Sequence, residues 1–313
     1  MDQHLLVFVT VVEKGNFSRA AEELHMTQPA VSQYIQLLER SYGTKLLERN
    51  NKYVRLNKAG EIVYSHAKEI IGLYSRMKGL IDDLSSHAGG PLSIGSSYTF
   101  GEYVLPHFIA KLHEQFPLVK PSITIGNTKE IAELVLGHQL DIGIIEGDYK
   151  KAPLKIEAFA EDTMFVVASS QHRLAQQESE VDISDLEEET WIVREKGSGT
   201  REAVEKVFHN MSIAPTNIME FGSTQLIKES VESGLGITFL SQLTFRKEIS
   251  MGLLKIIKVK NSTPFKRNFS IVLRTSFKTK ALDVFIELLK EHHTLSIIMK
   301  EAERFKKSPY SAE

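Results

Sequence analysis

The sequence contains no cysteine among its 313 residues. This absence excludes disulfide bonds, thiolate zinc sites and a cysteine nucleophile, and it fits a reducing compartment. Long hydrophobic segments are missing too, because no apolar run approaches the roughly 18 residues that a membrane-spanning helix needs. The N-terminus lacks the basic region, apolar core and small-residue cleavage site of a signal peptide. We therefore expect a protein that stays in the cytoplasm and has no membrane partner.

Motifs of common enzymes are also lacking. The sequence has no GxxxxGK[ST], HExxH, GxSxG or GxGxxG pattern. The 11 histidines are scattered, and the one adjacent pair, His292 and His293, falls on an apparent surface helix. We expect neither catalysis nor a bound cofactor or metal.

The charge is unevenly distributed, although the chain as a whole carries only −2. Residues 1–60 hold eight Lys and Arg against six Asp and Glu, and the remainder holds 30 against 34. Between residues 40 and 58 the basic side chains outnumber a single acid, Glu48. Such a local basic patch is what contact with DNA phosphates requires, and an ordinary solvated face is the alternative. The six basic residues are Arg40, Lys45, Arg49, Lys52, Arg55 and Lys58.

The segment 17–39 predicts two short helices joined by a tight turn. Ser18 is the expected N-cap of the first helix, because its hydroxyl can accept a free backbone N–H and helix-forming residues follow it. Thr27 is the expected N-cap of the second helix. Pro29 then falls in the first turn, where a missing N–H removes no hydrogen bond.

The second helix has two distinct faces. Val31, Ile35 and Leu38 recur at helical spacing and indicate a buried side. The opposite side is rich in amides and almost uncharged, which suits hydrogen bonding to base edges in the major groove; an ordinary solvated face is the alternative. The residues on this outer side are Gln28, Pro29, Ser32, Gln33 and Gln36.

A two-stranded wing with basic tips is predicted after these helices. Asn50 and Asn51 favour a turn, and the residues that follow alternate as in a strand. Such a wing would lie along the sugar-phosphate backbone and fix position, not sequence. The expected phosphate contacts are Arg49, Lys52 and Arg55. The apolar residues expected to close the small core are Tyr42, Leu46 and Leu47.

A long helix is predicted from the N-cap Asn57 to Leu84. Its apolar residues repeat at alternating spacings of four and three, which is a heptad seam sustained for about three repeats. We expect this seam to pair two copies of the chain, and packing against the chain's own domain is the alternative. The seam residues are Val63, Ala67, Ile70, Tyr74, Met77, Ile81 and Leu84.

The second half of the chain alternates strands and helices, which predicts a parallel sheet with right-handed crossovers. It follows a flexible joint, SSHAGGP, at residues 85–91. Two apolar segments, around residues 164–168 and 269–274, could carry the chain from one subdomain to another and back. Two crossings predict a hinged domain of two lobes.

Small hydroxyl-rich turns end several of these strands, at residues 96–99, 126–128, 197–201 and 222–224. Each turn opens an apparent helix, so helix capping explains each one singly. Four together, with a basic residue beside one, favour a small ligand that carries a carboxylate or other oxyanion. The candidate ligand-binding residues are Ser96, Ser97, Tyr98, Thr99, Asn127, Thr128, Gly199, Thr200, Arg201 and Ser223.

The first 60 residues resemble the winged helix-turn-helix of LysR-type transcriptional regulators. The matching residues are Phe8 and Val12, then FSRAAEELHMTQPAVSQYIQLLE, YGTKLLER and LNKAGE. The resemblance extends through nearly the whole chain. It implies that Gln28, Pro29, Ser32 and Gln33 face the major groove; Ser18 belongs to the same DNA-binding set. The family often has Arg where this chain has Gln33 and Gln36, so the operator sequence is open.

The resemblance also implies how the remainder works. The long helix would pair subunits, giving a dimer or tetramer on a palindromic operator, with RNA polymerase as a further candidate partner. The second half is similar to the effector domain of the family, which is like periplasmic binding proteins, and matching positions place Ser97, Thr128 and Thr200 in its cleft. The phrases IGSSYTFGEYVLP, IGNTKEI and REKGSGTRE look like the branch linked to sulfur assimilation, which suggests a small sulfur metabolite or inorganic anion.

We therefore predict an α/β protein made of a winged helix-turn-helix, a long linker helix and a two-lobed periplasmic-binding-protein-like effector domain. Its function would be ligand-responsive transcriptional regulation. A cytoplasmic solute-binding protein is the alternative, but it would leave the first 84 residues unexplained. The expected domains are a DNA-binding domain (1–58), a dimerisation helix (59–86), a hinge (87–91), an effector domain (92–300; lobe I 92–162 and 267–300, lobe II 163–266) and a tail (301–313).

Overall fold

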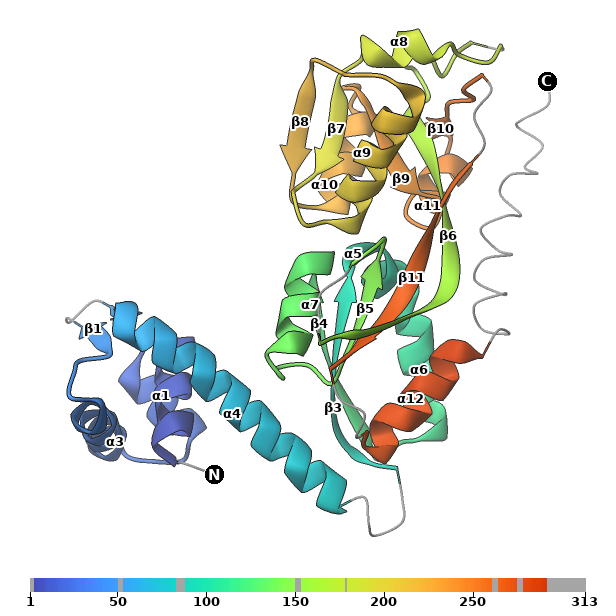
Figure 1. Cartoon of the computed structure of the whole chain (residues 1–313). Coiled ribbons are helices and arrows are strands. Elements are labelled where there is room, and N and C mark those ends of the chain that lie inside the picture. Colours follow the sequence, from blue (N-terminus) through green and yellow to red (C-terminus); the bar gives the residue numbers. More distant parts are fainter. Residues whose placement is uncertain are drawn as a thin grey trace. The chain divides into compact units, whose positions relative to one another are not determined.

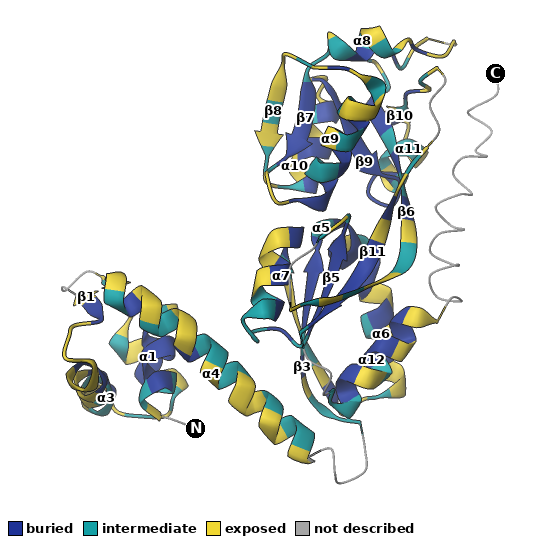
Figure 2. Ribbon diagram, viewed as in Figure 1, coloured by how far each residue is buried: buried dark blue, intermediate teal, exposed yellow. Residues whose placement is uncertain are grey.

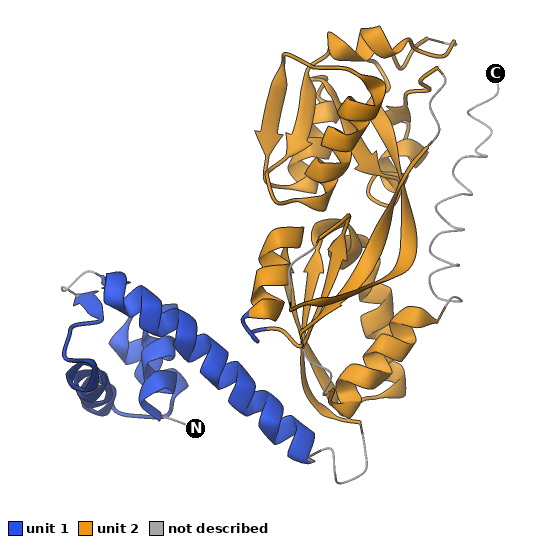
Figure 3. Ribbon diagram, in the orientation of Figure 1, with its two compact units in different colours: residues 1–86, 137–139 blue, residues 87–136, 140–313 orange. Residues whose placement is uncertain are grey.

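The computed structural model describes residues 3–49, 53–82, 88–149, 153–177, 179–260, 264–274 and 278–291. These residues belong to two units (Figure 3). The first unit comprises residues 1–86 with 137–139, and the second comprises 87–136 with 140–313. The histidine pair, Leu84, the tail at 301–313 and the predicted turn at Asn50 and Asn51 lie outside the described residues.

The first unit is a winged helix-turn-helix followed by one long helix (Figure 1). Its core contains Phe8, Val31, Ile35 and Leu46, each with no exposed surface. The heptad-like spacing of Val31, Ile35 and Leu38 therefore identified the buried side of the second helix correctly. The elements are α1 (Gln3–Lys14), α2 (Phe17–Glu23), α3 (Gln28–Tyr42), β1 (Leu47–Arg49), β2 (Val54–Leu56) and α4 (Lys58–Asp82).

The ends of the two short helices follow from their capping residues, with one correction. Asn16, not Ser18, caps α2, because its side-chain oxygen accepts the N–H groups of Ser18 and Arg19 at 2.8 and 3.1 Å. The prediction for Ser18 was wrong by two positions because Asn is an equally good cap and Phe17 already belongs to the helix. Thr27 caps α3 as predicted, accepting the N–H of Ala30.

A buried carboxylate holds the end of α3 to the wing. Glu39 is 5% exposed, and its side chain accepts the backbone N–H of Leu46 at 3.0 Å and pairs with Lys45 at 2.8 Å. Burial alone would raise the pKa of Glu39, but these two partners outweigh it and lower the pKa. Leu46 and Leu47 close the core as predicted, whereas Tyr42 was wrongly assigned there and is 53% exposed. The turn at Gly43, where φ is +67°, separates Tyr42 from the core-facing chain.

The long helix α4 begins as predicted, because Asn57 Oδ1 accepts the N–H of Gly60 at 2.8 Å. Along its first turns Ala67 is 1% exposed and packs, together with half-buried Val63, against the core of the same unit. The alternative of packing against the chain's own domain therefore holds for these two residues. Other large apolar residues of α4 are exposed, and much of this helix has the exposed colour in Figure 2. They are Ile62, Ile70, Leu73, Tyr74, Met77 and Ile81.

Within its described residues, the second unit is built on one sheet of nine strands, in the order β4-β3-β5-β11-β6-β9-β7-β8, with β10 paired to β6. The outer strands pair in parallel on both sides, as predicted. The strands are β3 (Gly90–Ser97), β4 (Val119–Gly126), β5 (Ile142–Glu146), β6 (Lys155–Ser169), β7 (Trp191–Arg194), β8 (Ile218–Phe221), β9 (Ile237–Ser241), β10 (Leu254–Ile256) and β11 (Phe265–Leu273).

Two crossing strands divide this unit into the two predicted lobes. β6 and β11 pair antiparallel along their length and run together between the lobes in Figure 1. β6 begins at Lys155, earlier than the predicted segment at 164–168. Exposed and half-buried residues follow one another irregularly in its first half, so that half has neither the apolar run nor the alternation that marks a strand in a sequence. Each lobe has its own core, around Phe100 and Phe285 in lobe I and around Trp191 and Phe239 in lobe II.

Helices cover both faces of these strands. They are α5 (Tyr98–Tyr103), α6 (Leu105–Gln115), α7 (Thr128–Leu136), α8 (Ile183–Glu187), α9 (Gly199–Met211), α10 (Thr224–Glu232), α11 (Arg246–Ser250) and α12 (Lys280–Lys290). The helices of the described residues include none that is both long and apolar enough to cross a membrane.

Candidate functional site

The outer side of α3 presents the predicted base-reading residues to solvent. Gln28, Pro29, Gln33 and Gln36 are exposed, and Ser32 is half-buried. Gln28 Nε2 donates to Ser32 Oγ at 2.9 Å, which links two of the predicted residues to each other. The face therefore offers uncharged amide donors and acceptors on a rigid helix, which is the chemistry needed for contacts with base edges.

The wing follows α3 along the chain and carries some of the residues that were predicted to contact DNA phosphates. β1 and β2 pair antiparallel, with Glu48 opposite Arg55. Arg55 is exposed, and its guanidinium lies 5.0 Å from the centre of the Tyr53 ring. Arg49 ends β1, whereas Lys52 lies outside the described residues. Ser18 is exposed near the start of α2.

In the second unit, predicted hydroxyl residues converge on one buried carboxylate, that of Glu146 at the end of β5. Glu146 is 2% exposed. Its Oε1 accepts hydrogen bonds from Ser97 Oγ at 2.9 Å and from the backbone N–H groups of Thr99 and Phe100 at 2.7 and 3.2 Å. Its Oε2 accepts bonds from the hydroxyls of Thr99 at 3.2 Å and Thr200 at 3.5 Å. Five hydrogen bonds, from side chains and backbone of both lobes, therefore end on this one carboxylate.

A buried arginine on the crossing strand β11 completes this cluster. Arg267 is 6% exposed, and its Nη1 lies 2.9 Å from Glu146 Oε2. Its two terminal nitrogens also donate to Thr200 Oγ1 at 2.9 Å and to Thr99 Oγ1 at 3.0 Å. Thr99 belongs to lobe I and Thr200 to lobe II. One guanidinium therefore joins the two lobes where the crossing strands pass between them.

A second carboxylate lies on the other side of the guanidinium. Asp162 on β6 has no exposed surface, accepts Arg267 Nε at 2.8 Å and accepts Ser241 Oγ at 2.6 Å. Burial is the largest influence on Asp162 and raises its pKa, although Arg267 and Ser241 oppose it. Burial likewise disfavours the charged form of Arg267, but the two carboxylates outweigh this and raise the pKa of Arg267. The cluster is thus one cation between two acids.

The hydroxyl-rich turns both cap helices and supply this cluster, with the two tasks divided between neighbouring residues. Ser198 and Ser223 cap α9 and α10 through their side chains, and Asn127 Oδ1 accepts the N–H of Glu130 in α7. The next residues point inward instead: Thr128 Oγ1 donates to the carbonyl of Glu146 at 3.0 Å. At Gly199 an added Cβ would lie 2.1 Å from that same carbonyl oxygen, so only glycine permits this approach of the lobes.

The remaining predicted residues have other partners. Tyr98 lies under the guanidinium of buried Arg194, which is 4.3 Å from the ring centre. Arg201 is held away from the cluster's carboxylates by bonds to Glu205 and Glu220 at 2.7 and 3.0 Å. Ser96 is buried and donates to the carbonyl of Ser97.

Sequence reasoning missed the charged residues of the cluster: Glu146, Asp162 and Arg267. A signal was present at Glu146, because it ends a strand that is buried throughout, and charged residues are seldom fully buried without a partner. Asp162 and Arg267 gave no such signal, because exposed or half-buried residues flank both of them. Arg194, 1% exposed at the end of β7, gave the same signal as Glu146. It pairs with Glu195 at 2.7 Å and donates to Thr224 Oγ1.

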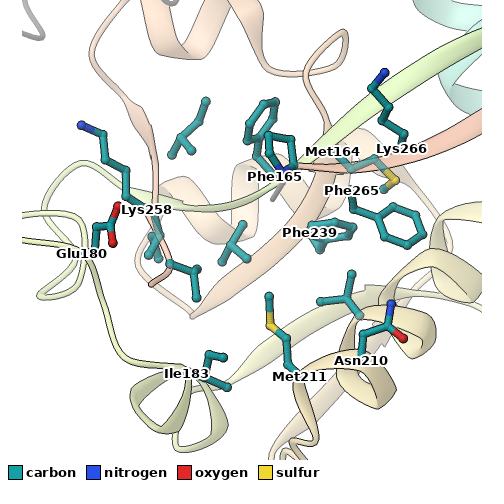
Figure 4. A pocket seen from close by; sticks show the side chains of 16 residues that line it. Met164, Phe165, Glu180, Ile183, Asn210, Met211, Phe239, Lys258, Phe265 and Lys266 are labelled. Atoms are coloured by element: carbon teal, nitrogen blue, oxygen red, sulfur yellow. The ribbon is translucent and has the colours of Figure 1, made fainter. Parts of the chain in front are cut away.

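Lobe II also contains a hollow that is separate from the predicted residues. A cavity of about 580 Å³ lies between β6, α9 and the segment around β10 (Figure 4). Apolar side chains such as Met164, Met211, Phe239 and Phe265 line it together with the charged side chains of Glu180 and Lys258. None of the ten candidate ligand-binding residues is among those that line it.

Comparison with known proteins identifies the family. Residues 3–61 match the bacterial regulatory helix-turn-helix proteins of the lysR family, and residues 85–294 match the LysR substrate binding domain. The chain belongs to the LysR family of transcriptional regulators. It is 38% identical to the HTH-type transcriptional regulator CysL of Bacillus subtilis, over 94% of this chain and 98% of that protein.

Two solved structures resemble this LysR regulator. The full-length structure of CbnR with its target DNA has a TM-score of 0.69 and 21% identity, covering 92% of this chain and 98% of that chain, and shows the shared fold. The regulatory domain of CcmR from Synechocystis PCC6803, in complex with 2-PG, has a TM-score of 0.57 and 26% identity. It covers 64% of this chain and 96% of that chain.

Replacing Arg267 tests whether the cluster holds the effector domain together. Arg267→Met leaves two buried carboxylates without their cation, so we expect stability to fall by about 3–5 kcal/mol. Urea unfolding followed by the fluorescence of Trp191, buried in lobe II, measures this loss. The control is Lys266→Met on the same strand, whose pair with Glu161 is exposed on both sides and should change stability by less than about 1 kcal/mol. Equal effects of the two variants would contradict the prediction.

Proposed function

We propose that this LysR regulator binds operator DNA as a dimer or tetramer and changes its binding when a small anionic metabolite enters the Glu146–Arg267 cluster. The observation that carries this proposal is the buried guanidinium of Arg267, which donates to hydroxyls of both lobes. A ligand that replaces any of these contacts must alter how the lobes are joined. The ligand switches the protein only if it binds the two arrangements with different affinities.

The donor set of the cluster favours an anionic effector. Backbone N–H groups, hydroxyls and a guanidinium all donate hydrogen bonds, and bonds to an ionised acceptor are the stronger kind. The 2-PG bound to the CcmR domain, and the resemblance of three segments of the sequence to the sulfur-assimilation branch of the family, make small carboxylates and sulfur metabolites the first candidates. Ser97, Thr99, Thr128 and Thr200 would line the site.

On the DNA side, we assign base reading to α3 and backbone contact to the wing. Gln28, Pro29, Ser32, Gln33 and Gln36 would face the major groove, while Arg55 and its neighbours in the wing neutralise phosphates. Two copies are needed for an operator with two half-sites, since the second copy adds its contacts at a high effective concentration. The operator would accordingly be an imperfect palindrome.

Dimerisation is assigned to the uncovered apolar stripe of α4. Ile70, Tyr74, Met77 and Ile81 are 40–59% exposed in the single chain, which is unusual for adjacent large apolar residues on one helix face. Ile62 and Leu73 extend the same stripe. The relatives are transcriptional regulators, and a DNA-binding unit joined to a dimerisation helix suits the same role. Both points favour a cytoplasmic regulator over an enzyme.

The base-reading assignment predicts different effects of two variants. Gln33→Ala should reduce affinity for the operator by about 1–3 kcal/mol while affinity for random DNA is retained. Arg55→Ala should weaken both and reduce the slope of log affinity against log salt by about 1. Fluorescence anisotropy with the upstream region of the gene and with random duplex measures both, with Gln3→Ala on α1 as the control. If Gln33→Ala lost affinity equally for both duplexes, the base-reading assignment would be wrong. If the wild-type protein showed no preference for the upstream region at physiological salt, the regulator proposal would be wrong.

The dimer assignment predicts the effect of charge on the stripe. Ile70→Lys with Met77→Lys should raise the dimer dissociation constant about 100-fold or more, because each buried apolar contact of this kind contributes about 2 kcal/mol. Sedimentation equilibrium of the full chain gives the constant. Ser75→Lys, an exposed position on another face of α4, is the matched control. A dimer that persists with unchanged affinity would show that the interface lies elsewhere.

The effector assignment predicts a ligand-dependent rise in melting temperature. A thermal-shift screen of sulfur metabolites and small carboxylates should yield anions that stabilise the protein by mass action. Thr200→Ala should bind such a ligand about tenfold more weakly, because it loses a hydroxyl that bonds to Arg267. Thr216→Ala, exposed in the same lobe, should bind it like the wild type. An unchanged ligand affinity with Thr200→Ala would remove the cluster from the effector site.

A further inference from the structure

The proposed effector position already contains an anion, and that anion belongs to the protein. The carboxylate of Glu146 takes the N–H groups of Thr99 and Phe100, the hydroxyls of Ser97, Thr99 and Thr200, and one nitrogen of Arg267. All of these groups act as donors toward the carboxylate. An entering anion would therefore find the donors it needs occupied by a group of its own chemistry.

The side chain of Glu146 can leave this position without disturbing the strand that carries it. Its backbone is held separately, because its carbonyl accepts Thr128 Oγ1 and Glu146 pairs with Phe269 in the sheet. The guanidinium of Arg267 would also keep a partner, since its Nε bonds to Asp162. The backbone contacts of Glu146 in the sheet therefore do not depend on whether its carboxylate occupies the anion position.

We propose that Glu146 is an internal ligand of the cleft, whose carboxylate holds the place of the effector's anionic group and is displaced when the effector binds. This inference rests on the proposed function, because it concerns the same cluster. The effector can bind only while Glu146 has left the anion position. Its apparent affinity is therefore its intrinsic affinity multiplied by the fraction of time for which the position is vacant. Displacement also sets a chemical requirement: the ligand must supply a small carboxylate or other oxyanion, since a neutral group cannot replace a carboxylate against Arg267.

Removing the internal carboxylate should create a binding site for a free one. Glu146→Ala deletes a CH₂–COO⁻ group, whose shape and charge are those of acetate. We expect acetate to bind the full-length variant saturably and to raise its melting temperature, with an affinity at least about tenfold higher than for the wild type, because no internal competitor remains. Acetamide, which has the same shape and no charge, should have no such effect. Calorimetric titration and thermal shift at constant ionic strength measure both ligands.

The matched control is Glu195→Ala. It also removes a carboxylate from a buried arginine, Arg194, which is 1% exposed, but it leaves the donors around Glu146 occupied. Acetate should therefore bind Glu195→Ala no better than the wild type. Equal acetate binding by the two variants would overturn the inference, because it would mean that any unpaired buried arginine attracts acetate. Equal acetate binding by Glu146→Ala and the wild type would overturn it too.

Loss of folding does not obscure the result. If Glu146→Ala is unfolded in dilute buffer, refolding in acetate but not in acetamide supports the inference; failure to refold in acetate, while the isosteric Glu146→Gln folds, contradicts it. The readout needs neither DNA nor the natural effector. Acetate binding by Glu146→Ala together with the absence of any metabolite that alters operator affinity would therefore reject the proposed function, while it would still show that Glu146 occupies an exchangeable anion position. A metabolite that alters operator affinity, without acetate binding by Glu146→Ala, would support the proposed function and reject this inference.

Discussion

The buried guanidinium of Arg267 is the interaction on which the effector domain depends. It is a cation removed from water, and it is stable there only because Asp162 and Glu146 neutralise it and hydroxyls complete its hydrogen bonds. Those hydroxyls come from both lobes, so the electrostatic requirement of one side chain also fixes how the lobes meet. Gly199, which admits the carbonyl of Glu146 beside it, allows the approach.

This arrangement connects the stability of the domain with ligand binding. A cluster made of one cation and two acids is sensitive to any further anion, because the low local dielectric strengthens each charge interaction. Asp162 remains with Arg267 through Nε, whereas Glu146 shares the donors that an oxyanion would use. The two acids therefore have different roles. Asp162 holds the arginine in position, and Glu146 occupies the position that an effector anion would take.

The DNA-binding unit was largely predictable because its signals are local. Thr27 and Pro29 mark the start of α3, and Val31, Ile35 and Leu38 mark its buried side, since capping and helical spacing are read directly from neighbouring residues. Ser18 failed as a cap because the helix begins two residues earlier than predicted, where Asn16 accepts the N–H groups of Ser18 and Arg19. Glu39 could not be foreseen, because its partner N–H belongs to Leu46 beyond the end of the helix and becomes close only through the turn at Gly43.

The cluster around Glu146 was predictable only in part, for a physical reason. Ser97, Thr99, Thr128 and Thr200 were predicted as ligand-binding residues from hydroxyl-rich turns, and they lie together in the fold; their role in ligand binding stays a prediction. Glu146 and Arg267 are 121 positions apart, and their pairing follows from the antiparallel register of β5, β11 and β6, which no local pattern encodes. Likewise, the apolar seam of α4 was visible in the sequence, but only the packed core shows that Ala67 belongs to the chain's own domain and Ile70 does not.

The most direct test is a crystal structure of the full chain with the ligand that the thermal-shift screen identifies. The account predicts that the ligand's anionic group lies within hydrogen-bond distance of the Arg267 guanidinium and of the hydroxyls of Thr99 and Thr200, and that the Glu146 side chain has turned away. A ligand bound in the separate cavity of lobe II, or bound while Glu146 keeps its present hydrogen bonds, would contradict the account.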